Sequence, residues 1–98
     1  MIKVVIKPKQ IEISGHAMFA DYGNDIVCAA ASSIVITTVN GILSLDKNSL
    51  KYTLNDDGLK VDILKDDEIY NKLILNMINL LKELSNQYKK NIQIYEEV

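Results

Sequence analysis

An apolar stretch from residue 26 to residue 45 constrains the fold of this 98-residue chain more than any other feature. Its β-branched middle favours a strand locally. However, the stretch is too long for one ordinary strand, and Cys28 with the three alanines after it favours a helix. Asn24 or Asp25 suits the helix cap, so we predict a helix from there to about residues 41–44. Because this helix is apolar nearly all round, we expect it to be the most buried element.

The same stretch is interrupted by seven Ser, Thr, Asn and Gly residues. A membrane-spanning helix needs about 20 predominantly apolar residues, so we expect no span here. The N-terminal segment MIKVVIKPK alternates apolar and charged residues and lacks the continuous apolar core of a signal peptide. We therefore expect a cytoplasmic protein that does not contact membranes.

Alternation and helical periodicity predict the remaining elements. Strands are expected at 2–7, 11–14, 50–54, 59–63 and 92–95. Hairpin turns are expected at Pro8 and at Asp57-Gly58. An amphipathic helix is expected from Asp66 to Lys89–Lys90. The order is ββαββαβ. This predicts one α+β domain over residues 1–98, with two helices packed on a mostly antiparallel sheet.

Charge and cysteine content narrow the classes of function. The net charge is −2, and all eleven basic residues are lysines, scattered along the chain except for one adjacent pair. Nucleic-acid backbones are bound by clustered cations, so direct nucleic-acid binding is not expected. One cysteine forms no intramolecular disulfide, and no zinc-type spacing is present. We expect neither a metal nor a cofactor.

The only cysteine, Cys28, follows the only histidine, His16, by twelve positions. A thiol and an imidazole are the usual parts of a nucleophile and its base. In the first turn of the predicted helix, free backbone N–H groups and the helix dipole favour a thiolate and offer an oxyanion site. Asp21 and Asp25 are both candidates to orient the imidazole.

Simpler explanations exist for each of these residues. A lone cysteine among alanines is usually a small buried hydrophobe, and a lone histidine near a loop is usually solvated. Asp25 is equally suited to act as a cap alone. Phe19 and Tyr22 fit either a substrate-binding loop or the core. From the residues alone, an enzyme and a non-catalytic domain both remain open.

Two segments then resemble a known family. Gly15-His16-Ala17, followed by DYGNDIVCAAASS at residues 21–33, is similar to the signature of the ribosomal-processing cysteine protease (Prp) family. The resemblance implies a bacterial cytoplasmic cysteine endopeptidase that removes an N-terminal extension from a large-subunit ribosomal protein. It also implies a homodimer.

The resemblance assigns roles to individual residues. Cys28 would be the nucleophile and His16 the general base. Asp25 and Ser32 would support the site, and Gly15 would let the histidine-bearing segment move on substrate binding. The substrate loop would comprise Phe19, Asp21, Tyr22 and Gly23.

Two further hypotheses are kept beside the protease. One is a non-enzymatic, ribosome-associated protein-binding module of the same fold. The other is a redox-sensing thiol at Cys28, which would form a sulfenic acid or an intermolecular disulfide without cleaving peptide bonds. The protease ranks first because of the motif.

Overall fold

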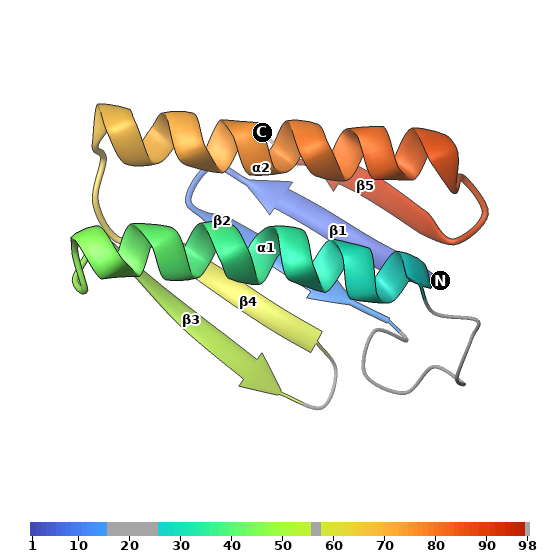
Figure 1. Cartoon of the computed structure of the whole chain (residues 1–98), viewed down its shortest axis with the longest axis horizontal. Helices are drawn as coiled ribbons and strands as arrows, with labels where there is room; N and C mark the ends of the chain where they lie inside the picture. Colours follow the sequence, from blue (N-terminus) through green and yellow to red (C-terminus); the bar gives the residue numbers. More distant parts are fainter. Residues whose placement is uncertain (16–25, 56–57, 98) are drawn as a thin grey trace.

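The computed structural model describes residues 1–15, 26–55 and 58–97 of the chain. Five strands and two helices follow one another in the predicted order: β1 (Ile2–Lys7), β2 (Gln10–Ser14), α1 (Ile26–Leu45), β3 (Leu50–Asn55), β4 (Gly58–Ile63), α2 (Glu68–Gln87) and β5 (Ile92–Glu96). Both helices lie on one face of the sheet and run side by side in opposite directions (Figure 1). The predicted α+β architecture is confirmed.

The strands form one sheet in the order β3-β4-β2-β1-β5. Three neighbouring pairs are antiparallel, and β1 with β5 is parallel, beginning at the pair Ile2–Ile92. Both hairpins predicted from the alternating patterns are present, and β2 joins them by pairing with β4. In the centre of the sheet, Ile13 lies between Val4 and Leu59. Alternation therefore places apolar residues on one face, toward the helices.

The core fills the space between this sheet face and the two helices. Its buried residues are Ile2, Val4, Ile11, Ile13, Val27, Cys28, Ala31, Val35, Val39, Ile42, Leu50, Leu59, Val61, Ile74, Met77, Leu81 and Ile92. The opposite sheet face carries mostly charged and polar side chains, which is the pattern expected of a two-layer domain.

Helix α1 extends over Ile26–Leu45, close to the predicted range. Its buried residues recur at three- and four-residue steps, which is one face of a helix. The expectation that α1 would be the most buried element is wrong. Ile36 and Leu45 are exposed, whereas β2 and β4 contain no exposed residue. The sheet and α2 cover only one side of α1, so its outer apolar residues remain at the surface.

Helix α2 begins where the acidic cluster predicted it. The Asp67 side chain caps the helix by accepting hydrogen bonds from the backbone N–H groups of Ile69 at 2.9 Å and Tyr70 at 3.0 Å. The predicted end at Lys89–Lys90 is wrong. The helix ends at Gln87, and its last turn contains no basic residue.

By length and composition alone, α1 is also able to cross a membrane. The core helix of a soluble protein and a signal sequence share this length and composition. In this structure one third of the residues in the apolar window of α1 are buried inside the domain.

An ion pair joins the end of α1 to the segment after β4. The Lys65 Nζ lies 2.6 Å from Asp46 Oδ2, while Asp46 Oδ1 accepts a hydrogen bond from the Asn48 N–H at 2.9 Å. The hydrogen bond from Lys65, with that from Asn48, lowers the pKa of Asp46, and the same carboxylate raises the pKa of Lys65. Desolvation, followed by the charge of Asp46, raises the pKa of Tyr70.

We expect truncation of the core to cost far more stability than truncation on the surface of the same helix. Met77 is fully buried in α2, whereas Leu75, two residues earlier, is 56% exposed. Met77→Ala should lower the free energy of unfolding by about 2–5 kcal/mol because it leaves a cavity. Leu75→Ala, the matched control, should change it by less than about 0.5 kcal/mol. Urea denaturation followed by circular dichroism measures both, and equal effects would contradict the described core.

The Asp46–Lys65 pair should make stability depend on pH. Because the pKa of Asp46 is lowered, its carboxylate contributes fully to the free energy of unfolding above the ordinary carboxyl pKa. This contribution is lost as the pH falls through the lowered pKa. Because the pKa of Lys65 is raised, its ammonium group contributes fully to the free energy of unfolding below the ordinary lysine pKa. This contribution is lost as the pH rises through the raised pKa.

We therefore expect the stability lost by Asp46→Asn to be largest near neutral pH and to shrink at acid pH. Thermal unfolding from acid to neutral pH tests this. Glu83→Gln, at an exposed position on α2 outside this ion pair, is the charge-matched control and should change the stability at neutral pH by less than about 0.5 kcal/mol. A pH-independent difference for Asp46→Asn would mean that the ion pair contributes nothing.

Candidate functional site

The described segments on either side of residues 16–25 meet at one end of the molecule. Strand β2 ends there at Ser14, Gly15 follows it, and α1 begins there at Ile26 (Figure 1). Residue Met1 lies at the same end. The structure therefore brings the end of β2 and the start of α1 to the same edge of the domain.

Cys28 is the third residue of α1, as the sequence predicted. The first N–H groups of a helix have no partner within the helix, and the dipole makes this end positive. Both effects favour a thiolate and can hold an oxyanion. The Cys28 side chain is only 1% exposed and belongs to the core cluster. Burial disfavours the charged form, so the helix start and the apolar surroundings act on the thiol in opposite directions.

Ser32 lies one helical turn after Cys28 and is half-buried. Side chains four positions apart share a helix face, so Ser32 is a neighbour of Cys28 along α1. Ser33, the next residue, is exposed on another face. The supporting role of Ser32 stays a prediction.

Gly15 has a backbone conformation that other residues rarely adopt, with φ at +110°. A Cβ at this position would also lie far inside the van der Waals contact distance of the Met1 carbonyl oxygen. The resemblance implied that Gly15 lets the histidine-bearing segment move on substrate binding. The geometry adds a separate requirement, because only glycine fits between the end of β2 and the backbone at Met1.

The remaining predicted site residues fall outside the described parts of the chain. These are His16, Phe19, Asp21, Tyr22, Gly23 and Asp25, together with the proposed cap at Asn24. Their roles, including the Cys28–His16 dyad, stay predictions. In residues 1–15, 26–55 and 58–97, no three His, Cys, Asp or Glu side chains are grouped to hold a metal ion.

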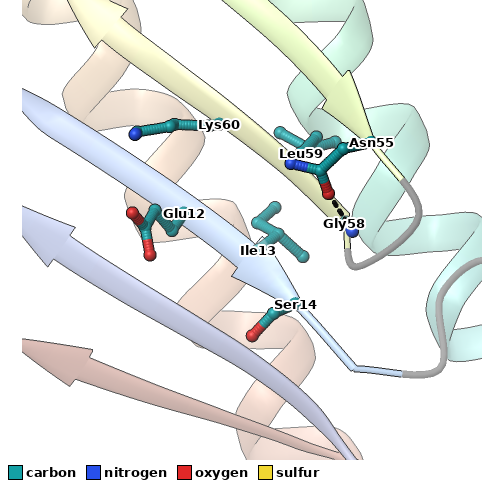
Figure 2. A pocket seen from close by; sticks show the side chains of 7 residues that line it. All are labelled: Glu12, Ile13, Ser14, Asn55, Gly58, Leu59 and Lys60. Carbon is teal, nitrogen blue, oxygen red and sulfur yellow. Dashed lines mark hydrogen bonds between the residues drawn. The ribbon is translucent and has the colours of Figure 1, made fainter.

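The sequence did not predict a hollow of about 210 Å³, lined by both polar and apolar residues, next to this end of β2. Figure 2 shows its lining residues, which are Glu12, Ile13, Ser14, Asn55, Gly58, Leu59 and Lys60. The turn at Gly58 was visible in the sequence, but the pairing of β2 with β4 was not. Only that pairing brings these seven residues together.

Comparison with known proteins identifies the family of the chain. The family model of cysteine protease Prp matches residues 1–93. A ribosomal processing cysteine protease Prp of Mycoplasma genitalium is 32% identical over 99 residues, covering 99% of this chain and 97% of the relative. A protein of the same name from Staphylococcus aureus is 32% identical over 94 residues, covering 90% of this chain and 86% of the relative.

A solved structure shares the fold along the whole chain. It is the crystal structure of an essential ribosomal processing protease Prp from S. aureus in complex with a substrate peptide. The two chains superpose with a TM-score of 0.85 at 25% identity, covering 99% of this chain and 100% of the other.

The fit of Gly15 is testable against another glycine of the same chain. Gly15→Ala should lower the free energy of unfolding by about 1–3 kcal/mol, because both the backbone angle and the space exclude a Cβ. Gly41, inside α1, has no atom within 4 Å of an added Cβ. Gly41→Ala should therefore stabilise the protein by about 0.4–1 kcal/mol. Chemical denaturation of both variants measures the difference, and a neutral Gly15→Ala would refute the assignment.

Proposed function

Because the chain belongs to the cysteine protease Prp family, we propose that it is an endopeptidase that processes a ribosomal protein. Its substrate is the N-terminal extension of a large-subunit ribosomal protein, which it removes during ribosome maturation. The names of its relatives support the ribosomal substrate, and the substrate peptide bound to the S. aureus protein supports peptide-bond cleavage.

One observation carries the proposal. A cysteine protease needs a thiol nucleophile, and this chain contains a single cysteine. That cysteine is the third residue of α1, where helix N–H groups and the dipole favour a thiolate. The family, the composition and the helix position therefore all point to Cys28.

The proposed chemistry uses His16 as the general base. The imidazole accepts the proton of the Cys28 thiol, and the sulfur attacks the carbonyl carbon of the scissile peptide. Backbone N–H groups at the start of α1 hold the oxyanion of the tetrahedral intermediate. The intermediate collapses to a thioester, and protonated His16 gives its proton to the departing amine. Water activated by His16 then hydrolyses the thioester and restores the thiol.

Other residues have supporting roles in the proposal. Asp25 or Asp21 orients the imidazole, and Ser32 shapes the site beside Cys28. The loop residues Phe19, Tyr22 and Gly23 contact the substrate. The nearly complete burial of Cys28 supports an opening step before attack, since a peptide bond must reach the sulfur. Gly15, at the base of the histidine-bearing segment, would accommodate that step.

The proposal extends to assembly and location. The enzyme acts as a homodimer in the bacterial cytoplasm, without a cofactor and without direct contact to nucleic acid or membrane. Its net charge of −2, with scattered lysines, supports recognition of a protein rather than of a nucleic-acid backbone.

A second candidate function is a ribosome-associated binding module without catalysis. The burial of Cys28 in the core favours it, because a buried cysteine commonly serves as a small hydrophobe. In that case the thiol would be inert and Cys28→Ala would leave biological function intact.

Intact-mass analysis of the ribosomal protein precursor tests the reaction. Incubation with the wild-type protein should yield one defined N-terminal truncation, and Cys28→Ala should lower the rate by at least about a thousandfold. Ser33→Ala, at an exposed position of the same helix, is the matched control and should retain activity. An uncleaved precursor with the wild-type protein, or full activity of Cys28→Ala, would contradict the proposal.

The role of His16 has a separate test. His16→Ala should lower kcat by about a hundredfold to ten-thousandfold, because the thiol loses its base. The pH profile of Cys28 alkylation by iodoacetamide should move to higher pH in the variant. An unchanged profile would remove His16 from the mechanism while leaving Cys28 as a possible nucleophile.

A further inference from the structure

The side of the two helices that is turned away from the sheet has little charge. No described element packs on this side (Figure 1). Helix α1 contains no charged residue at all, although Ile26, Ile36 and Leu45 on it are exposed. A helix whose outer side faces water normally carries charged residues there. The composition of α1 therefore favours contact between its outer side and another apolar surface.

Exposed apolar residues of α2 continue this surface. Lys82 forms an ion pair with Glu96 of β5, so the flank of α2 that carries Lys82 and Leu75 faces the edge of the sheet. The opposite flank, toward α1, carries the exposed residues Leu73 and Leu80. Two helices of this length side by side present a surface about 30 Å long and about 20 Å wide. Buried on two chains, such a surface amounts to about 1,200 Å², which is enough for a stable interface.

A polar stripe runs along the outermost side of α2. Lys72, Asn76, Asn79 and Glu83 recur at steps of four, three and four residues, and all four are exposed. The residues of α2 that are buried in the core lie on the other side of the helix. The order along the stripe is cation, amide, amide, anion. The stripe is therefore complementary to its own reverse.

A two-fold axis at the midpoint of this stripe, between residues 77 and 78, would bring it onto its copy. In a two-fold interface, each contact between two different residues occurs twice. Antiparallel α2 helices would then place Lys72 opposite the partner's Glu83, and Asn76 opposite the partner's Asn79. Two amide side chains can exchange donor and acceptor, and polar residues between paired helices fix their register.

Neither charged residue of the stripe is held strongly within its own chain. The Lys72 Nζ lies 3.5 Å from Glu68 Oε1, but both side chains are largely exposed, and surface pairs of this kind contribute little. None of the ion pairs between described residues involves Glu83. Both residues are therefore able to form an ion pair with a second chain.

A lipid surface fits the same side of the molecule less well. A helix that lies on a membrane buries an unbroken apolar side and keeps its polar residues on the opposite side. In α2 the polar stripe runs along the middle of the outer side, between the apolar flanks. The complementary order of its charges favours a second copy of this chain.

We propose that the outer side of α1 and α2 binds the same surface of a second chain in a two-fold, antiparallel arrangement. Ion pairs between Lys72 and the partner's Glu83 set the register of this interface. The proposal rests on the homodimer of the proposed function and names its surface, and it does not depend on peptide-bond cleavage.

Charge reversal tests the surface. The variants are Lys72→Glu, Glu83→Lys and the double variant that carries both changes. Reversal is used because neutral replacement removes only an exposed ion pair, whereas reversal places like charges opposite each other twice in the dimer. Lys51→Glu, an exposed lysine on β3 and on the opposite face of the sheet, is the matched control. Circular dichroism establishes that each variant folds.

Sedimentation velocity over a range of protein concentrations measures the dissociation constant of the dimer. Each single reversal should raise it by at least about tenfold. The double variant should return to within about threefold of the wild type, because the opposite charges face each other again. An equimolar mixture of the two single variants should form a heterodimer of similar affinity. Lys51→Glu should match the wild type.

Three results would overturn this surface. If the single reversals dimerise as well as the wild type, the interface lies elsewhere and the homodimer itself still stands. If neither the double variant nor the mixture restores association, the two residues are not in direct contact. A wild type that stays monomeric and binds phosphatidylcholine vesicles would assign the surface to lipid and remove the dimer as well. Cleavage of the precursor tests the protease function separately.

Discussion

The packing of α1 against one face of the sheet is the interaction on which the rest of the structure depends. Val35, Val39 and Ile42 on this helix are almost completely buried, and they share one core cluster with residues from all five strands and from α2. Apolar burial of this kind is the main stabilising contribution to a small domain. The same face carries Cys28 at its first turn. The helix that holds the domain together therefore also fixes the position of the only thiol.

This shared use places two demands on one residue. As part of the core, Cys28 is stabilised by apolar contacts that exclude water. As a nucleophile it needs its sulfur accessible and its thiolate stabilised. The N–H groups and the dipole at the helix terminus favour the thiolate from the backbone, whereas burial in the core opposes it and keeps the sulfur from substrate. The position of Cys28 thus combines a requirement of the core with a requirement of the proposed chemistry in a single side chain.

Local patterns in the sequence were sufficient for most of the elements and for the position of Cys28. Alternation predicted the two hairpins, and the acidic cluster ending at Asp67 predicted the start of α2. The extent of burial of α1 was mispredicted, because composition does not show which side of a helix its neighbours cover. Lys89 and Lys90 suggested a helix end two residues beyond the real one. Charge near a terminus favours an end there without fixing the residue.

Features that depend on pairing across long sequence separations were beyond such patterns. The pairing of β2 with β4 unites the two hairpins, and it alone assembles the hollow at the end of β2. The steric requirement at Gly15 arises from the backbone at Met1, on the neighbouring strand's side of the sheet. Cys28 and His16 were recognisable as candidates from the sequence, whereas the strands that neighbour the end of β2 follow from the sheet order.

The parallel pairing of β1 with β5 has a consequence for how the domain is made. The Ile2–Ile92 pair joins residues separated by nearly the whole described chain, and Ile92 is completely buried. During synthesis β1 emerges first, and one of its edges then has no partner until β5 has been translated. Contacts between such distant residues slow folding because the intervening chain must be ordered first. A nascent chain of this protein therefore exposes one edge of β1 until β5 has been translated, and chaperones or other strands can compete for that edge in the meantime.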